Sequence, residues 1–274
     1  MSVTETPFFF GDEHQLFGIL AEPTDVEPRK TGVLILNSGL VHRSGPFRMG
    51  VEISRELAAR GFPVLRFDQS ARGDSERRSG VTVVEAANLD INLAKDALRS
   101  NSGAESVVLA GLCSGADDAL RHIAATDDVT GSLLMDPVAP RTTGFLFHHI
   151  FPRALSLPKW FRFISRKITS MRQAKAEGPG LDLGAIREFP TREEAGAAFR
   201  KMHAKGGASL CVFTGGVSYY YNHKGQLVQG FDLKDIRDSV EEVFFKSAEH
   251  TYPLKFHRDK LVATIADFCV RRFN

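Results

Sequence analysis

A junction between a strand and a helix at residues 106–116 restricts the fold more than any other part of this sequence. It reads Ser-Val-Val-Leu-Ala-Gly-Leu-Cys-Ser-Gly-Ala, so glycines stand two residues before and two residues after Cys113. A turn this sharp strains its central residue and needs small residues on both sides. The pattern therefore predicts that Cys113 projects from the carboxyl end of a strand. The free N–H groups that begin the helix would favour its thiolate.

Strand and helix patterns alternate on both sides of this junction. Apolar runs such as 32–36 are typical of parallel strands that are buried on both faces. Two short strands within 7–23 precede them. The further predicted strands are 32–36, 64–67, 106–110, 131–135, 210–214 and 243–246, and the predicted helices are 48–60, 83–98, 115–126 and 258–273. This order predicts an α/β fold with a mostly parallel sheet and helices on both faces.

The alternation stops at about residue 140 and resumes at about residue 208. We therefore divide the chain into a core formed by 1–139 and 208–274 and an inserted helical cap, 140–207. Between residues 141 and 205 the sequence has thirteen Lys or Arg and five Asp or Glu, although the whole chain has a net charge of only +2. Aromatic and basic side chains are mixed there: Phe145, Phe147, Phe151, Trp160, Phe161 and Phe163 with Arg153, Lys159, Arg162, Arg166 and Lys167.

Such a cap can admit an acyl chain and attract a negatively charged carrier. Two other interpretations stay open. The aromatic residues can simply pack the cap onto the core, or an amphipathic face within 157–171 can meet a membrane or a partner.

The composition of the chain restricts its class. A net charge of +2 gives no case for nucleic acid. Three scattered cysteines are too few for a disulfide framework or a zinc site, and we expect neither a metal nor a cofactor. The sequence has no run of about 18 apolar residues, so we predict no membrane span. The first residues do not resemble a signal peptide, so we expect a cytoplasmic protein.

The Gly-x-Cys-x-Gly turn in its strand–helix setting resembles the nucleophile elbow of the α/β-hydrolase family, and the resemblance covers nearly the whole chain. Most members carry serine at this point, whereas a minority similar to dienelactone hydrolases carry cysteine. Together with Leu-Met-Asp-Pro at 134–137, the elbow also resembles a bacterial group of cysteine hydrolases and acyltransferases. The resemblance implies that Cys113 is the nucleophile and that the backbone N–H of Ser114 helps to bind an oxyanion. Alternatively, Cys113 is a small core residue, or the elbow has lost its chemistry.

The same resemblance implies roles for two other loops. His250 follows the last predicted strand and precedes the closing helix, which is the family's place for the catalytic histidine. The loop 37–43 resembles the second half of the oxyanion hole, with the backbone N–H of Leu40 as donor. His42 and Arg43 beside it can bind a substrate carboxylate or phosphate, or belong to a solvated loop. Asp68 and Asp74, in the turn after the next strand, are predicted to be structural.

The catalytic acid is less clearly marked. The family most often supplies it after the strand predicted at 210–214, but the following residues, 215–222, contain no carboxylate. Asp136, at the end of the strand 131–135, occupies the other place that the family uses, and we predict it as the acid. The alternatives are Asp232, Asp235 and Asp238, or a Cys113–His250 dyad without an acid, because a thiolate depends less on one.

We therefore predict a hydrolase or acyltransferase that acts on an ester or thioester through an acyl-cysteine. The predicted partners are a small acyl substrate and, from the basic cap, coenzyme A or an acyl carrier protein. The alternative is a catalytically inactive protein that uses the same fold for binding or as a scaffold. The sequence leaves the substrate, the oligomeric state and the choice between hydrolysis and transfer open.

Overall fold

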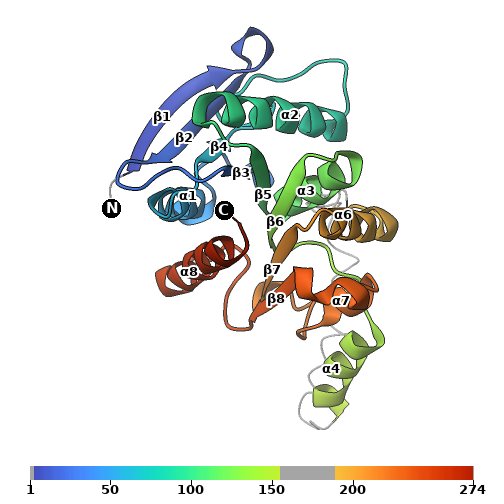
Figure 1. Cartoon of the computed structure of the whole chain (residues 1–274). Helices are drawn as coiled ribbons and strands as arrows, with labels where there is room; N and C mark the ends of the chain where they lie inside the picture. Colours follow the sequence, from blue (N-terminus) through green and yellow to red (C-terminus); the bar gives the residue numbers. More distant parts are fainter. Residues whose placement is uncertain (1–2, 155–188, 274) are drawn as a thin grey trace, which may run out of the picture.

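The computed structural model describes residues 3–154 and 189–273, which form an eight-stranded sheet (Figure 1). The strand order is β1-β2-β4-β3-β5-β6-β7-β8. β2 is antiparallel to β1 and β4, and all other neighbours are parallel. The strands are β1 (Val3–Phe10), β2 (Leu16–Pro23), β3 (Thr31–Ile35), β4 (Val64–Phe67), β5 (Ser106–Leu112), β6 (Val129–Met135), β7 (Ala208–Thr214) and β8 (Val240–Phe245).

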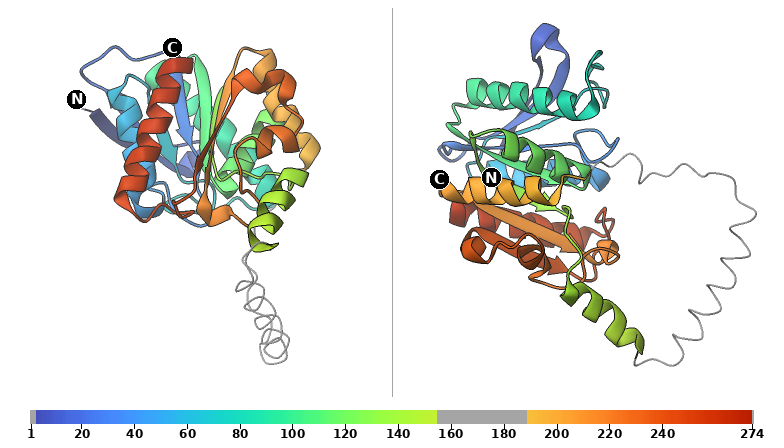
Figure 2. Two further views of the ribbon diagram at one scale, coloured as in Figure 1. Left: turned by 90° about the horizontal axis from the view of Figure 1, so that it is seen from below. Right: turned by 90° about the vertical axis from the view of Figure 1, so that its right-hand side faces the viewer.

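Helices cover both faces of this sheet (Figures 1 and 2). On one face lie α1 (Met49–Ala59) and α8 (Lys255–Arg272), and on the other lie α2 (Val83–Ser102), α3 (Ser114–Ala125) and α6 (Arg192–Ala204). Shorter elements fill the connections: α4 (Thr143–Ala154), α7 (Gln226–Gly230), η1 (Asp12–His14), η2 (Pro46–Arg48), η4 (Gly215–Val217) and η5 (Lys234–Ser239).

Two apolar layers explain why the central strands read as continuous apolar runs. Leu34 of β3 belongs to the layer under α2, α3 and α6, whereas its neighbour Val33 belongs to the layer under α1 and α8. Successive side chains of a strand point to opposite faces, so a strand covered on both faces needs apolar residues throughout. The predicted α/β architecture with a mostly parallel sheet is confirmed.

The end of the predicted cap, 140–207, belongs to the core layer. Its last helix, α6, packs on α3 and buries Ala195, Phe199 and Met202 in the core. Thr191 and Glu194 form a capping box that begins α6. At the other end of the segment, α4 projects from the carboxyl edge of the sheet (Figure 1). Trp160, Phe161, Phe163 and the basic residues 153–167 predicted to line the cap lie outside the residues whose side chains are described.

The carboxyl ends of β3 to β8 meet at one edge of the sheet, because these strands are parallel. The loops that carry the predicted site residues all leave from this edge. Across residues 3–154 and 189–273, every helix is too short or too polar to cross a membrane.

Candidate functional site

Cys113 lies at the turn between β5 and α3, in a strained backbone conformation. Its φ is 58° and its ψ is −119°, values that residues with a side chain rarely adopt. Its N–H donates to the Met135 carbonyl of β6 at 2.9 Å, and its own carbonyl accepts from the N–H of Ala116 at 3.0 Å. The neighbouring strand and the first turn of α3 thus hold the strained residue.

The two glycines of the elbow are needed for close packing. A Cβ on Gly111 would overlap the backbone of Gly115, and a Cβ on Gly115 would overlap the carbonyl of Asn37. The structure therefore bears out the steric reason for the Gly-x-Cys-x-Gly pattern. Of the three cysteines, Cys113 is the one with a partly exposed side chain. Burial raises the pKa of the Cys211 thiol, and it raises that of Cys269 to about 12, so these two are unsuited to be nucleophiles.

Asp136 and His250 meet beside the elbow. Nδ1 of His250 is hydrogen-bonded to Oδ2 of Asp136 at 2.7 Å, and the Asp136 side chain is fully buried. Thr214, which ends β7, donates its N–H to Oδ1 at 2.7 Å and its hydroxyl to Oδ2 at 2.8 Å. Tyr220 donates its hydroxyl to the Asp136 carbonyl at 3.0 Å. Sequence patterns did not indicate Thr214 and Tyr220, because their role depends on the pairing of β6 with β7.

Two opposing effects set the protonation of His250. Burial disfavours the imidazolium, but the hydrogen bonds and charges of Asp136 and Cys113 outweigh burial and raise the pKa of His250 to about 9. His250 is therefore protonated at neutral pH. Its hydrogen bonds to Asp136 and Cys113 place the three predicted catalytic residues in one continuous chain.

The loop after β7 gives space to the histidine instead of supplying an acid. A Cβ on Gly216 would lie 2.5 Å from the backbone N of His250, and a Cβ on Gly215 would overlap the Lys246 carbonyl. The N–H of Gly216 also donates to the Ala248 carbonyl at 3.2 Å. These glycines let the loop between β8 and α8 lie against the end of β7.

The other carboxylates considered for the acid lie elsewhere. Asp235 and Asp238 belong to η5, and Asp232 precedes it with a φ of 54°. The hydrogen bond to His250 comes instead from Asp136.

The predicted oxyanion loop lies against the start of α3. The N–H of Gly39 donates to Oγ of Ser114 at 2.8 Å, and the Ser38–Val41 bridge closes a turn around Gly39 and Leu40. Leu40 has 81% of its surface exposed, so its side chain leaves the core. The structure thus brings together the two residues predicted to offer backbone N–H groups, Leu40 and Ser114.

Arg43, which was predicted to bind a substrate carboxylate or phosphate, makes contacts within the protein. Its guanidinium forms ion pairs with Asp68 at 2.5 Å and Asp74 at 2.7 Å and lies over the ring of Phe17. Asp68 also accepts from the Arg43 N–H at 2.6 Å. The guanidinium is therefore committed inside the protein, and Asp68 is structural as predicted. His42 is exposed, and its Nδ1 accepts weakly from the Ser44 N–H at 3.4 Å.

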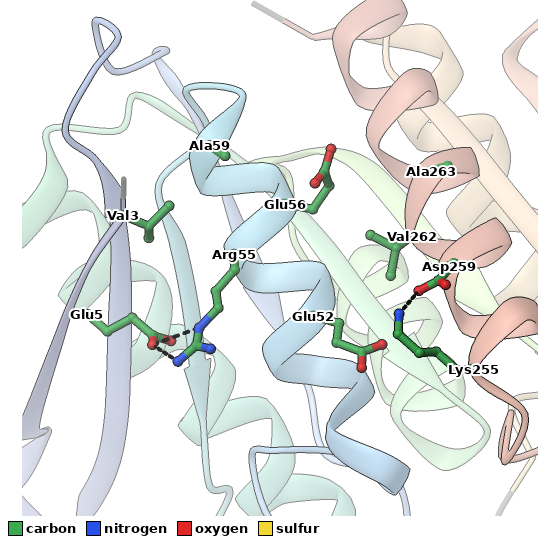
Figure 3. Close-up of a pocket in the computed structure, with 10 residues that line it drawn as sticks. All are labelled: Val3, Glu5, Glu52, Arg55, Glu56, Ala59, Lys255, Asp259, Val262 and Ala263. Carbon is green, nitrogen blue, oxygen red and sulfur yellow. Dashed lines mark hydrogen bonds and ion pairs between the residues drawn. The ribbon is translucent and has the colours of Figure 1, made fainter. Parts of the chain in front are cut away.

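Two further observations concern other kinds of site. In the described part of the chain, no three His, Cys, Asp or Glu residues are placed to hold a metal ion. An open groove of about 800 Å³ lies between β1, α1 and α8, where Glu5 pairs with Arg55 and Lys255 pairs with Asp259 (Figure 3). Its ten lining residues include none of the predicted site residues, so the groove is separate from the Cys113 site.

Known proteins resemble this chain in structure rather than in sequence. No family model matches the sequence, and no curated protein is significantly similar to it. An esterase from Pyrococcus furiosus superposes with a TM-score of 0.61 at 16% identity, over 99% of this chain and 91% of the esterase. A dienelactone hydrolase from Anabaena variabilis gives 0.59 at 12% identity, with both chains fully covered. A lidless α/β serine hydrolase from Xanthomonas campestris gives 0.57 at 13%, over 100% of this chain and 96% of its own.

At these identities the likenesses concern the fold. The chain has the α/β-hydrolase fold.

Proposed function

We propose that this protein is an enzyme that cleaves an ester or thioester through an acyl-cysteine formed on Cys113. The observation that carries the proposal is the hydrogen-bonded chain from Cys113 through His250 to the buried Asp136. Structural neighbours that are esterases and a dienelactone hydrolase support chemistry on esters. The acyl group then passes from Cys113 to water or to another nucleophile.

The reaction begins from an ion pair. With the proton already on His250, the Cys113 thiolate attacks the carbonyl carbon and forms a C–S bond. The N–H groups of Ser114 and Leu40 stabilise the negative charge that develops on the carbonyl oxygen. The bond to the leaving alkoxide or thiolate then breaks, and His250 donates its proton to that group. In the second half, His250 takes a proton from the incoming water or acceptor, which attacks the acyl-cysteine and restores the thiolate.

The high pKa of His250 favours cysteine over serine as the nucleophile. A histidine with a pKa of about 9 is a poor base at neutral pH. A serine hydroxyl needs such a base, whereas a cysteine can react as a thiolate beside a protonated histidine. The same histidine, already protonated, is then a ready acid for the leaving group.

A thioester of coenzyme A or of an acyl carrier protein is the carrier-linked substrate that the basic segment 141–205 predicts. Some of its cations have other partners. Lys201 and Lys205 both lie within ion-pair distance of Asp127, at 3.4 Å and 2.6 Å. A comparison of acetyl-CoA with p-nitrophenyl acetate tests the carrier, because both deliver the same acyl group. A kcat/KM that falls steeply with rising salt for acetyl-CoA, but not for p-nitrophenyl acetate, would support a negatively charged carrier.

The test of the proposal is direct detection of the acyl-enzyme. Wild-type protein mixed with p-nitrophenyl acetate should release a burst of p-nitrophenol and gain one acetyl group by intact mass. Cys113→Ala should abolish both, and Cys113→Ser should lower the burst rate by about 100-fold or more. Cys211→Ala is the matched control, a buried cysteine whose loss should leave the adduct in place.

A wild-type protein with neither a burst nor an adduct would contradict the proposal. It would favour the alternative of a binding or scaffold protein on this fold.

A further inference from the structure

The two peptide units that flank Gly39 are each held by a side chain. The N–H of Gly39 donates to Oγ of Ser114 at 2.8 Å, and the carbonyl of Gly39 accepts from Nε of Arg72 at 2.7 Å. Ser114 directly follows the nucleophile, and Arg72 comes from the loop after β4. Both polar groups of Gly39 are thus fixed by side chains far away in the sequence.

Fixing this carbonyl also fixes the N–H of Leu40. The two groups belong to one planar trans peptide unit and point in opposite directions. Among the described residues, none accepts a hydrogen bond from the Leu40 N–H, so it is free to meet a ligand. A cation at the carbonyl oxygen also polarises the amide and makes its N–H a stronger donor.

Arg72 itself stands on a rigid loop. The N–H and hydroxyl of Ser70 donate to the buried carboxylate of Asp90 at 2.7 Å and 2.9 Å. On the other side of Arg72, the N–H of Asp74 donates to the buried Asp68 at 3.1 Å. Two buried carboxylates therefore hold the loop on either side of Arg72, so its guanidinium can impose a direction on the peptide that it contacts.

Gly39 suits this arrangement for conformational reasons. Its φ is 55°, in the left-handed region, and a Cβ there would meet no atom within 4 Å. Glycine is therefore required by the backbone angle and not by lack of space.

We propose that Arg72 is a positioning residue of the oxyanion hole, which orients the Leu40 N–H through the Gly39 carbonyl, with the Ser114 hydroxyl as its counterpart on the Gly39 N–H. This rests on the proposed function. It adds a role for a side chain that touches neither the substrate nor the nucleophile. Removing Arg72 slows the step in which negative charge develops on the carbonyl oxygen and leaves the reactivity of the thiolate unchanged.

The experiment compares two reactions of the same thiol. Acylation by p-nitrophenyl acetate develops an oxyanion, whereas alkylation by iodoacetamide displaces iodide and develops none. Arg72→Met should lower the acylation rate by about 10- to 100-fold, the range for a weakened oxyanion donor, with KM and the alkylation rate changed less than about twofold. Arg77→Met, an exposed arginine of the same loop, is the matched control and should change neither rate.

A second variant tests the hydrogen bond on the other side of Gly39. Ser114→Ala keeps the backbone donor of Ser114 but removes the hydroxyl that holds Gly39. It should slow acylation by about threefold to tenfold, and the double variant should lose less than the product of the two single losses, because the two side chains hold adjacent peptide units that meet at Gly39.

Each outcome separates this proposal from the one on which it rests. An absent burst in the wild type would overturn the proposed function and this role with it. A normal wild-type burst with Arg72→Met unchanged would overturn the role of Arg72 alone. Equal slowing of acylation and alkylation would mean that Arg72 maintains the fold or the reactivity of the thiolate, and would overturn its role in the oxyanion hole. A higher KM confined to a negatively charged ester, p-nitrophenyl succinate, would make Arg72 a substrate contact instead.

Discussion

Asp136 and Asp68 lie at the same edge of the sheet, at the ends of β6 and β4, and both are fully buried. Asp68 is paired with the guanidinium of Arg43. Asp136 is hydrogen-bonded to the imidazole of His250. An arginine keeps its charge at every physiological pH, whereas a histidine can gain or lose one. The residue that pairs with a buried carboxylate thus determines the role of the pair: with arginine it is a structural ion pair, and with histidine it can take part in proton transfer.

The largest effect is expected when the titratable partner is removed. His250→Ala should lower the rate of acylation by p-nitrophenyl acetate by about 1000-fold or more, because the thiolate loses its counter-ion and the leaving group loses its acid. Burst kinetics measure this loss. His203→Ala, an exposed histidine on α6, should leave the rate unchanged. A loss below about tenfold would show that His250 is not the partner of Cys113.

Removal of the permanent partner should act on stability. Arg43→Met leaves the buried Asp68 carboxylate without its cation, and we expect the free energy of unfolding to fall by about 3 kcal/mol. Urea denaturation followed by circular dichroism measures the change. Lys234→Met, which removes an exposed cation, should stay within about 0.5 kcal/mol of wild type. Similar free energies of unfolding for Arg43→Met and Lys234→Met would show that the ion pair of Asp68 is not structural.

A smaller effect is expected when Asp136 loses its charge but keeps its shape. Asp136→Asn can no longer stabilise the imidazolium, so the pKa of His250 should fall and acylation should slow by about 100-fold. The pH profile of Cys113 alkylation measures the shift, and the burst measures the rate. An unchanged profile with an unchanged burst would mean that Cys113 and His250 act as a dyad.

The smallest effect concerns the pH dependence of stability. The pKa of His250 is raised from 6.5 to about 9 in the folded protein. Its contribution to stability is therefore fully present below about pH 6.5 and is lost as the pH rises through about 9, on the order of 2 kcal/mol. Urea titrations at a series of pH values measure this slope. The pH dependence of the free energy of unfolding should persist in Arg43→Met and largely disappear in His250→Gln. If His250→Gln retains it, another titrating group is its source.

Local sequence patterns predicted those parts of the fold that depend on local rules. The glycines around Cys113 and the apolar run of β3 satisfy steric and burial requirements that a single segment reveals. Asp136 and His250 could be predicted from their places at the ends of β6 and β8. What brings them together is the register of β6 against β7 and the packing of the next loop, which no single segment specifies.

The contacts between segments that are distant in sequence could not be predicted in this way. The ion pair of Arg43 with Asp68 could not be predicted from the sequence, because Asp68 follows a different strand, β4. The helix α6 was assigned to the cap because the alternation of strands and helices is interrupted between about residues 140 and 208. Its narrow apolar face with Phe199 and its capping box at Thr191 were the available signals. An interruption of the alternation therefore does not show by itself that a helix has left the core.

The glycine pair at the end of β7 has a consequence for how this site can change. An aspartate introduced at residue 216 would bring a Cβ within 2.5 Å of the His250 backbone, so it would displace the histidine that it was meant to assist. A single substitution at residue 215 or 216 therefore cannot supply an acid at the end of β7 without displacing the backbone of the loop between β8 and α8. Evolution or design would first have to lengthen the loop between β8 and α8, and until then the carboxylate that contacts His250 comes from the end of β6.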